Sequence, residues 1–225
     1  MMRKLFHYPL CGFSRAVRFL LSEKHLDFDL VYETPWSLSD ELLDQNLFGT
    51  IPVLVDINGT SVFGNSAIME YLNEVYSEID LIGSNCQQRT EARKLADWFC
   101  FIFYEEIYSH IVREKILKRF MRDIDRTPDP ASVRSACSKL PVHMNYISWL
   151  IDRRNWLAGK DFSIADIYAA SFISVLDYLG IIPWAKYELA KWWYARIKSR
   201  PGFRGILGDN LSQIPPSADY SNPDF

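Results

Sequence analysis

Short apolar runs of strand length recur through the first eighty residues of the chain. They lie at residues 5–8, 28–32, 53–57 and 61–63. Pro52 directly precedes the third run, and because proline donates no hydrogen bond to a strand ladder, it should begin that strand rather than lie within it. The Asn58-Gly59 dipeptide joins the last two runs and is a strong hairpin signal. The pattern predicts four strands, of which the last two form a hairpin.

Two amphipathic segments accompany these strands, one behind Ser14 and one behind Asn65-Ser66. Their apolar residues recur at helical spacing, namely Val17, Leu20 and Leu21 in the first segment and Ile68, Tyr71, Leu72, Val75 and Tyr76 in the second. The order is therefore strand, helix, strand, loop, strand, hairpin, strand, helix. We expect a small α/β domain over residues 1–80.

The second half of the chain has helical periodicity throughout. A polar stretch without periodicity at 77–89 marks a boundary between two domains. A long segment with apolar residues at helical spacing follows at 90–121. A second one occupies 131–150, where Pro141 predicts a kink or a new helix start. We expect an all-helical domain over residues 88–210.

A capping motif and the C-terminal tail are further features of this half. Ser163 precedes an apolar helix and Asp166 follows three residues later, which predicts a capping box worth about 1 kcal/mol. Residues 211–225 contain three prolines and no helical period, so we expect an extended tail. The tail ends in Asp224-Phe225, and it either packs on the domain as a strap or is presented as a peptide.

Composition narrows the class of protein. With 225 residues, 48% of them hydrophobic, the chain is long enough to bury a substantial core. The formal net charge of −3 gives no reason to expect nucleic acid as a partner. No apolar run approaches the ~20 residues that span a bilayer, and the N-terminus lacks an apolar signal segment. The four cysteines show neither metal-ligand spacing nor disulfide density. We expect no membrane insertion, no metal and a cytoplasmic location.

Cys11 is the sharpest chemical feature, because the predicted fold places it at the N-terminus of the first helix. Backbone N–H groups and the helix dipole favour an anion there, whether a thiolate or a ligand carboxylate. Such a position lowers a thiol pKa from its free value of about 8.5 and makes the thiol a nucleophile. The alternative is that Cys11 simply packs, because free cysteine is among the most buried residue types.

Together these stretches resemble the cytosolic glutathione S-transferase family. The likeness rests on the Cys11-Gly12-Phe13-Ser14 loop, Ile51-Pro52 before the hairpin, Asn65-Ser66 at a helix start, and residues 156–166 with the capping box. It implies a thioredoxin-like α/β N-terminal domain, an all-α C-terminal domain, and glutathione as the ligand.

The resemblance assigns glutathione-binding roles to four residues. It implies that Pro52 is cis, that the backbone of Ile51 meets the cysteinyl part of glutathione, and that Ser66 receives the γ-glutamyl carboxylate. Asn65 departs from the family, in which Glu or Asp usually precedes this serine and holds the ligand ammonium. Asn65 loses a charge-assisted hydrogen bond that is roughly twice as strong as a neutral one. We expect a glutathione site that is present but weakened.

The resemblance also implies three candidates for the catalytic group. The tetrad from Cys11 to Ser14 is similar to the monothiol glutaredoxin sequence, in which the cysteine forms a mixed disulfide with glutathione. Tyr8 and Ser14 are the alternatives, as hydroxyls that hydrogen-bond the glutathione thiolate in other classes of the family.

Trp36 is a large aromatic in a loop otherwise rich in turn formers and charges. It either folds back onto the domain or is an exposed anchor for a partner, because tryptophan is frequent among binding hot spots. Arg113, Lys115, Lys118, Arg119 and Arg122 make a basic run that is either a solvated helix face or a protein-docking patch.

Within the family, the chain resembles a branch of bacterial division proteins that bind the tubulin-like GTPase FtsZ. The likeness rests on Pro35-Trp36, Phe103-Tyr104 with the basic run that follows, residues 177–180, and the Asp224-Phe225 end. It implies a homodimer that engages FtsZ filaments through Trp36, and a tail that passes a signal toward cell-wall synthesis.

Two functions therefore compete. Asn65 and the tail favour a cell-division scaffold, which we prefer. The Cys11 loop and Ile51-Pro52 favour a glutathione-dependent enzyme, either a glutathione S-transferase or a Cys11-based thiol transferase.

Overall fold

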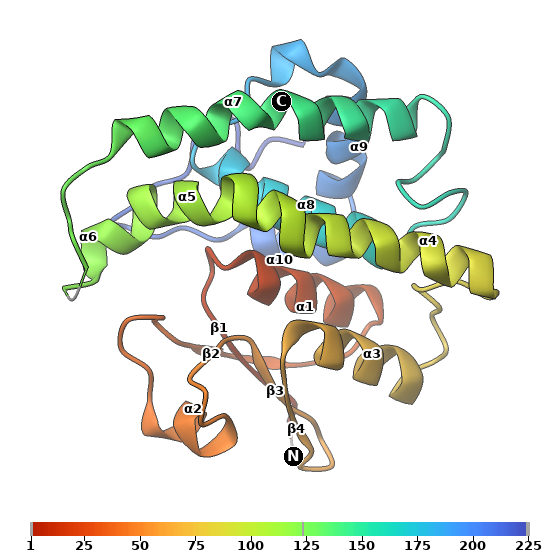
Figure 1. Ribbon diagram of the computed structural model, residues 1–225. Coiled ribbons are helices and arrows are strands. Elements are labelled where there is room, and N and C mark those ends of the chain that lie inside the picture. Colours follow the sequence, from red (N-terminus) through yellow and green to blue (C-terminus); the bar gives the residue numbers. More distant parts are fainter. Residues whose placement is uncertain (1, 123, 224–225) are drawn as a thin grey trace.

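A small sheet domain packs against a larger helical domain in the computed structural model, which describes residues 2–122 and 124–223 (Figure 1). The strands are β1 (Lys4–His7), β2 (Asp29–Tyr32), β3 (Val53–Val55) and β4 (Ser61–Phe63). They form one sheet in the order β2-β1-β3-β4, with β1 and β2 parallel and the other two pairs antiparallel. The predicted strands are confirmed, as is the hairpin at Asn58-Gly59.

The helices of the sheet domain connect it to the rest of the molecule. The two predicted helices, α1 (Gly12–Glu23) and α3 (Asn65–Val75), lie between the strands and the helical domain (Figure 1). A third helix, α2 (Asp40–Gln45), occupies the loop before Pro52 and was not expected. Ser39 Oγ caps it by accepting the N–H of Leu42. Six residues are too few to show a helical period in the sequence.

One continuous helical rod runs from Cys86 to Phe120. Its segments are α4 (Cys86–Asp97), η1 (Trp98–Tyr108), α5 (Ser109–Val112), η2 (Arg113–Leu117) and α6 (Lys118–Phe120). The η1 and η2 segments are π-helical, a widening of the helix that the apolar spacing did not reveal. The rod begins four residues before the predicted start, because Asn85 Oδ1 accepts the N–H of Gln88 as an N-cap.

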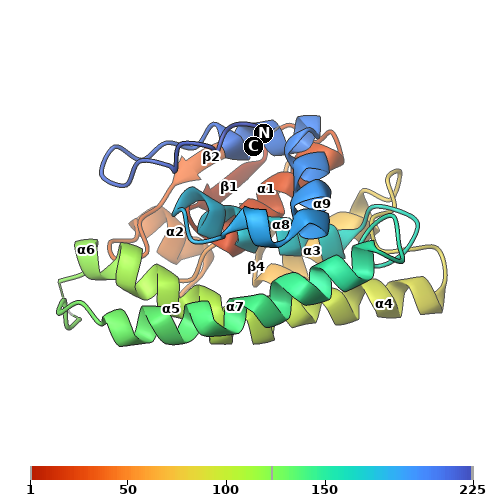
Figure 2. The same ribbon diagram turned by 90° about the horizontal axis from the view of Figure 1, so that it is seen from above.

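The helix α7 (Pro130–Ile151) runs beside the rod (Figure 1 and Figure 2). The predicted interruption at Pro141 is wrong, because α7 continues through it as a single helix. Proline removes one backbone hydrogen bond there, but Leu140, His143 and Met144 are buried on either side and hold this turn against the rest of the domain.

The helix α8 (Ile164–Tyr178) is the centre of the helical domain, and each of its residues is buried. The predicted capping box is confirmed at its start, where Ser163 Oγ accepts the N–H of Ala165 and Asp166 accepts the N–H of Ser163. The Asp166 carboxylate also accepts the indole N–H of Trp193 and so joins α8 to α9. The remaining helices are η3 (Trp184–Lys186), α9 (Glu188–Lys198), η4 (Pro201–Phe203) and α10 (Arg204–Leu207).

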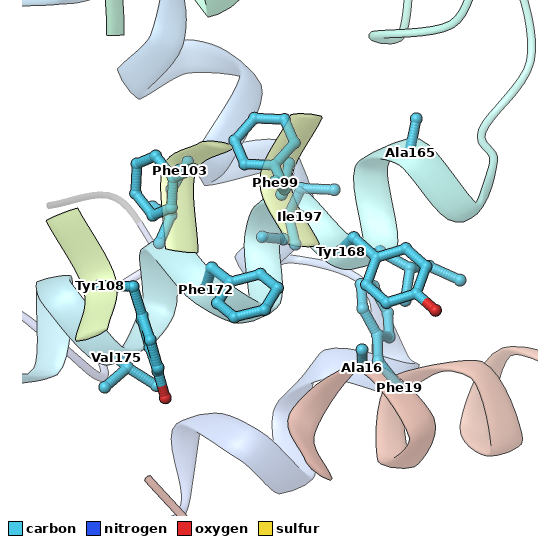
Figure 3. Close-up of a cluster of buried hydrophobic side chains, with 14 of the residues drawn as sticks. Ala16, Phe19, Phe99, Phe103, Tyr108, Ala165, Tyr168, Phe172, Val175 and Ile197 are labelled. Atoms are coloured by element: carbon cyan, nitrogen blue, oxygen red, sulfur yellow. The ribbon is translucent and has the colours of Figure 1, made fainter. Parts of the chain in front are cut away.

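The hydrophobic core continues without a break from one domain into the other. Ala16 and Phe19 of α1 lie in the same buried cluster as Phe103 of the rod and Phe172 of α8 (Figure 3). Gly12 shows how closely α1 approaches α8, since a Cβ at this position would lie 2.6 Å from the ring of Phe172. Burial of a phenylalanine is worth about 1.5–3 kcal/mol. The helical domain therefore fixes the start of α1 and the loop before it.

The C-terminal strap, which we define as residues 209–222, folds back onto the helical domain. The prediction of an extended tail is wrong for this part, because the strap contains turns at Leu211–Ile214 and Ser217–Tyr220. Tyr220 is fully buried and packs edge-on against Tyr178 at 5.0 Å between ring centroids. The strap alternative thus holds for the described tail, whereas Asp224 and Phe225 lie outside the described residues.

Candidate functional site

A cavity of about 480 Å³ opens where the sheet domain meets the rod. The sheet domain contributes Tyr8, Cys11, Ile51, Pro52 and Asn65 to its walls, and the rod contributes Tyr104 and Leu117 among others. The fold therefore gathers five of the residues selected from the sequence around one cavity, although they lie on separate loops.

Ile51 lines this cavity and has backbone polar groups without hydrogen-bond partners among the described residues. The Ile51–Pro52 peptide bond is cis, as the family resemblance implied. Among the described residues, neither the N–H nor the C=O of Ile51 has a hydrogen-bond partner in the protein. An extended peptide can pair with such groups as an added strand does. This position fits the backbone of a short peptide such as glutathione.

Cys11 is the N-cap of α1 and lies under the rod. The hydroxyl of Tyr108 accepts the N–H of Gly12 at 2.8 Å and donates to the carbonyl of Leu10 at 3.0 Å, so it fixes the loop on both sides of the cysteine. Burial raises the pKa of the Cys11 thiol, and the nearby Ser14 hydroxyl and helix N–H groups offset this only in part. Of the two alternatives for Cys11, the packed thiol agrees better with the structure, because desolvation outweighs the effect of the helix N-terminus.

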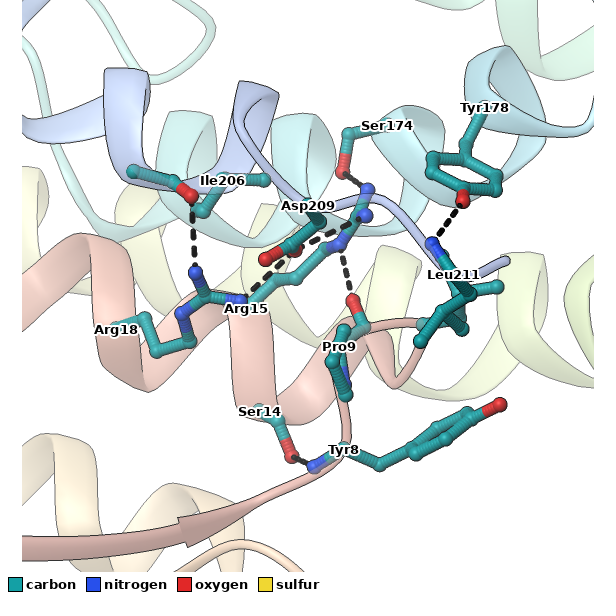
Figure 4. A network of polar contacts seen from close by, with 12 residues as sticks. Tyr8, Pro9, Ser14, Arg15, Arg18, Ser174, Tyr178, Ile206, Asp209 and Leu211 are labelled. Carbon is teal, nitrogen blue, oxygen red and sulfur yellow. Dashed lines mark hydrogen bonds and ion pairs between the residues drawn. The ribbon is translucent and has the colours of Figure 1, made fainter. Parts of the chain in front are cut away.

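Tyr8 and Ser14, the two alternative hydroxyls, differ in position. Ser14 is fully buried, and its Oγ accepts the backbone N–H of Tyr8 at 3.4 Å, so it faces the strand and not the cavity (Figure 4). The Tyr8 ring lines the cavity wall. Burial raises the pKa of the Tyr8 hydroxyl, which therefore stays protonated and is a hydrogen-bond donor. Of the two, only Tyr8 is placed to meet a ligand.

Asn65 turns toward the helical domain. Its Nδ2 donates to the hydroxyl of Tyr168 at 2.6 Å, and its Oδ1 is buried without a partner among the described residues. A second cavity of about 320 Å³ begins here and is also lined by Ser66 and Asp97. An unpaired buried acceptor costs free energy that a ligand donor would recover. Oδ1 therefore suits a ligand N–H group.

Ser66 is exposed in the first turn of α3, where the helix N-terminus favours a carboxylate. Asn65 lines both cavities, so an extended ligand can run from Ile51 past Asn65 to Ser66. The residues present thus fit glutathione, with one neutral amide where the family usually has a carboxylate.

Three residues of the site carry no local signal in the sequence. Tyr108 and Tyr168 look like core aromatics, and Asp97 looks like a solvated helix residue, until packing brings them to Cys11, Asn65 and the second cavity. Only the tertiary fold identifies them.

Trp36 is half-buried and folds back. Its indole stacks on Phe120 of the rod, with ring centroids 4.8 Å apart and planes 14° apart, and meets the Tyr8 ring edge-on at 5.4 Å. Of the two alternatives for Trp36, the folded-back one therefore holds. Trp36 instead forms a rigid aromatic edge where the two domains meet, beside the cavity.

A basic pocket adjoins this aromatic edge along the rod. It has a volume of about 480 Å³ and is lined by Lys115, Lys118, Arg119, Arg126 and Arg134, together with Glu114 and Asp129. Lys118 pairs with Glu114 at 2.7 Å. Within the described part of the chain, Lys115, Arg119 and Arg134 have no carboxylate partner. The pocket suits an acidic segment of a partner.

No group of three or more His, Cys, Asp or Glu side chains within residues 2–122 and 124–223 is arranged to hold a metal ion. No helix in the same part of the chain is both long enough and apolar enough to cross a membrane.

Family models of the glutathione S-transferase N-terminal and C-terminal domains match residues 10–75 and 130–201. These matches, the sheet order, the cis proline and the interdomain cavity agree, and the chain belongs to the glutathione S-transferase family. Among its curated relatives is FtsZ-localized protein A of Caulobacter vibrioides, which is 38% identical over 99% of this chain and 98% of that protein.

Two solved structures extend this similarity to the whole molecule. A glutathione S-transferase from Rhodospirillum rubrum F11 is 43% identical with a TM-score of 0.95, and FzlA from C. crescentus is 38% identical with a TM-score of 0.95. Each match covers all of both chains. The similarity therefore includes the strap as well as the two family domains.

Proposed function

We propose that this chain is a division-associated member of the family that binds FtsZ filaments in the cytoplasm through its aromatic edge, and that it retains a weakened glutathione site. The observation that carries this proposal is the end-to-end similarity to FtsZ-localized protein A, 38% over 99% of the chain. The altered site supports it, because Asn65 supplies no carboxylate and burial keeps the Cys11 thiol protonated. The role of the tail in signalling toward cell-wall synthesis belongs to the same proposal.

The surface assigned to the filament combines the aromatic edge with the basic pocket. Phe120 stacks on Trp36 and directly follows Arg119, which lines the pocket, so an apolar anchor and a cationic recess are contiguous. Aromatic and arginine side chains dominate binding hot spots, and cationic recesses steer acidic partners. The stacking holds Trp36 in one position, which lowers the entropy that binding must remove.

Co-sedimentation with FtsZ filaments assembled in GTP tests the proposal. We expect the protein to pellet only with filaments. We expect Trp36→Ala to weaken binding at least tenfold, about 1.4 kcal/mol, because it removes one half of the stacked pair. The matched control is Trp192→Ala on α9, whose side chain is 53% exposed and lies outside both the edge and the pocket. Failure of the protein to pellet, or equal losses in both variants, would contradict the proposal.

A glutathione-dependent enzyme is the second candidate function. The unpaired backbone groups of Ile51 and the buried, unpaired Oδ1 of Asn65 favour it, because both suit a peptide ligand. In a transferase, the Tyr8 hydroxyl would donate to the glutathione thiolate. In a thiol transferase, the Cys11 thiolate would attack the glutathione sulfur of a mixed disulfide, form a Cys11–glutathione disulfide, and release the other half as a thiolate that takes up a proton.

Calorimetric titration with reduced glutathione tests this candidate. Binding between micromolar and low millimolar, weakened by Ser66→Ala, would support a working site. Disulfide-reducing activity that survives Cys11→Ala would exclude the thiol mechanism, and a flat titration would leave the fold as a scaffold.

A homodimer is part of the proposal. Leu47, Phe48 and Phe63 are exposed apolar side chains of the sheet domain, and Phe101, Ile102 and Val142 are exposed apolar side chains of the helical domain; we call these two sets the apolar patches. Monomeric proteins rarely leave several large apolar side chains so exposed, so we assign the two patches to contacts between copies.

A further inference from the structure

Arg15 joins three distant segments of the chain inside the protein. Its guanidinium is fully buried, and its Nε donates to the carbonyl of Pro9 at 2.6 Å. Its terminal nitrogens reach the Ser174 hydroxyl of α8 at 2.8 Å and the Asp209 carboxylate at 3.2 Å (Figure 4). Pro9 lies in the loop that carries Cys11, and Asp209 opens the C-terminal strap. One side chain therefore connects the site loop to the strap.

Asp209 supplies the negative charge for two buried cations. Its Oδ2 also accepts from Arg18 at 2.8 Å, and the other nitrogen of Arg18 donates to the carbonyl of Gly205 (Figure 4). A buried guanidinium is strongly disfavoured without a counter-charge. The rings of Tyr178 and Tyr220 lie 5.7 and 5.6 Å from the Arg15 guanidinium and complete its surroundings. Departure of the strap would therefore leave Arg15 without its carboxylate and without one of these rings.

The strap docks as one unit around Tyr178. The Tyr178 hydroxyl accepts the N–H of Leu211 at 3.0 Å and donates to the carbonyl of Ile214 at 2.5 Å. Its backbone carbonyl accepts the N–H of Ser217 at 2.8 Å, and the hydroxyl of the buried Tyr220 donates to Ile206 at 3.0 Å. Because Tyr178 makes three of these four hydrogen bonds and its ring packs on that of Tyr220, the contacts are expected to form and break together.

We infer that the strap is a clamp on the loop that carries Cys11. When docked, Asp209 fixes Arg15, which holds the Pro9 carbonyl and keeps Cys11 under the rod. When a partner captures the strap, Arg15 loses its counter-charge, the Pro9 contact loosens, and the thiol, which is partly exposed with the strap docked, becomes more accessible. Asp209 and Arg15 are thus positioning residues for the site. The inference goes beyond the proposed function, because it holds whichever partner binds the strap.

Alkylation by iodoacetamide, followed residue by residue by mass spectrometry, tests the clamp in the full chain. In Asp209→Asn we expect the rate at Cys11 to rise at least tenfold while the rate at Cys100 stays within twofold of wild type. Cys100 lies in the rod, outside the Arg15 contacts, so it reports general opening of the fold. The matched control is Asp219→Asn, an exposed strap aspartate whose side chain reaches neither arginine, and we expect it to change neither rate.

A strap that only stabilises the fold predicts a different result. Equal acceleration at Cys11 and Cys100, or an unchanged rate at Cys11, would overturn the clamp. Native-state hydrogen exchange of the wild-type protein tests the coupling between the strap and the Cys11 loop even if Asp209→Asn fails to fold. We expect the amides of Leu211, Ser217 and Cys11 to open with a common protection factor. Strap amides that exchange much faster than that of Cys11 would contradict the coupling.

Discussion

We expect the burial of His7 to make this protein sensitive to acid. His7 lies in β1, is 4% exposed, and its Nδ1 is buried without a partner among the described residues. Burial, with further contributions from the charges of Arg18 and Arg15, lowers the pKa of His7 to about 3. In the unfolded chain the imidazole of His7 titrates near 6.5, so the unfolded chain binds a proton at pH values at which the folded protein does not. The stability that neutral His7 provides is therefore complete above pH 6.5 and is lost as the pH falls from 6.5 toward 3.

Urea unfolding of the wild type and of His7→Phe between pH 7 and pH 4 measures this effect. We expect the wild type to lose stability more steeply, by up to about 1.4 kcal/mol per pH unit, because the phenylalanine ring cannot take up a proton. His25→Asn is the control, since His25 is exposed and its φ of +55° is one that asparagine tolerates. Parallel pH profiles for the wild type and His7→Phe would show that His7 does not set the acid limit.

At the scale of single elements, the sequence predicts what depends on local period and local chemistry. The four strands, the helices after Ser14 and Asn65, and the capping box of α8 are all confirmed, because each has its own pattern. The six-residue α2 is too short to have one. At Pro141, burial of the flanking turns outweighs the local preference of proline to break a helix. Tertiary packing thus decided the elements that the pattern missed.

The features of the candidate site also fall into those set by a local motif and those set by contacts between distant residues. The cis bond before Pro52 follows from a loop motif and was foreseen from the family resemblance. The turn of Asn65 toward Tyr168 was not foreseen, whereas the packing of Cys11 and the folding back of Trp36 were each one of two alternatives that the sequence left open. The contacts of Asn65 and Trp36 depend on Tyr168 and Phe120, which lie far away in the sequence, and the pKa of Cys11 depends on burial. A local sequence motif does not identify the distant side chain that changes the chemistry of the motif.

At the scale of the whole molecule, the exposed apolar surface bears on the proposed association of two copies of the chain. Leu47 and Phe48 are 90% and 80% exposed, and the Phe48 ring lies 6.0 Å from that of Phe63 on β4. Phe101, on the rod, is 64% exposed. In a two-fold dimer, the sheet-domain patch of one copy covers the helical-domain patch of the other, and the contact occurs twice. Such an arrangement buries both patches at once and closes on itself.

Light scattering coupled to size-exclusion chromatography tests this arrangement. We expect a mass near twice the 26.2 kDa of one chain for the wild type and a single-chain mass for Phe48→Asp, because the substitution buries two unpaired carboxylates in every dimer. Phe101→Asp should act in the same way, since it alters the opposite side of the same contact. Leu189→Asp is the matched control, because Leu189 is an exposed apolar residue on α9, away from both patches, and should leave the dimer intact. A dimer that survives both Phe48→Asp and Phe101→Asp would place the interface elsewhere, and the two apolar patches would then be free to contact other proteins.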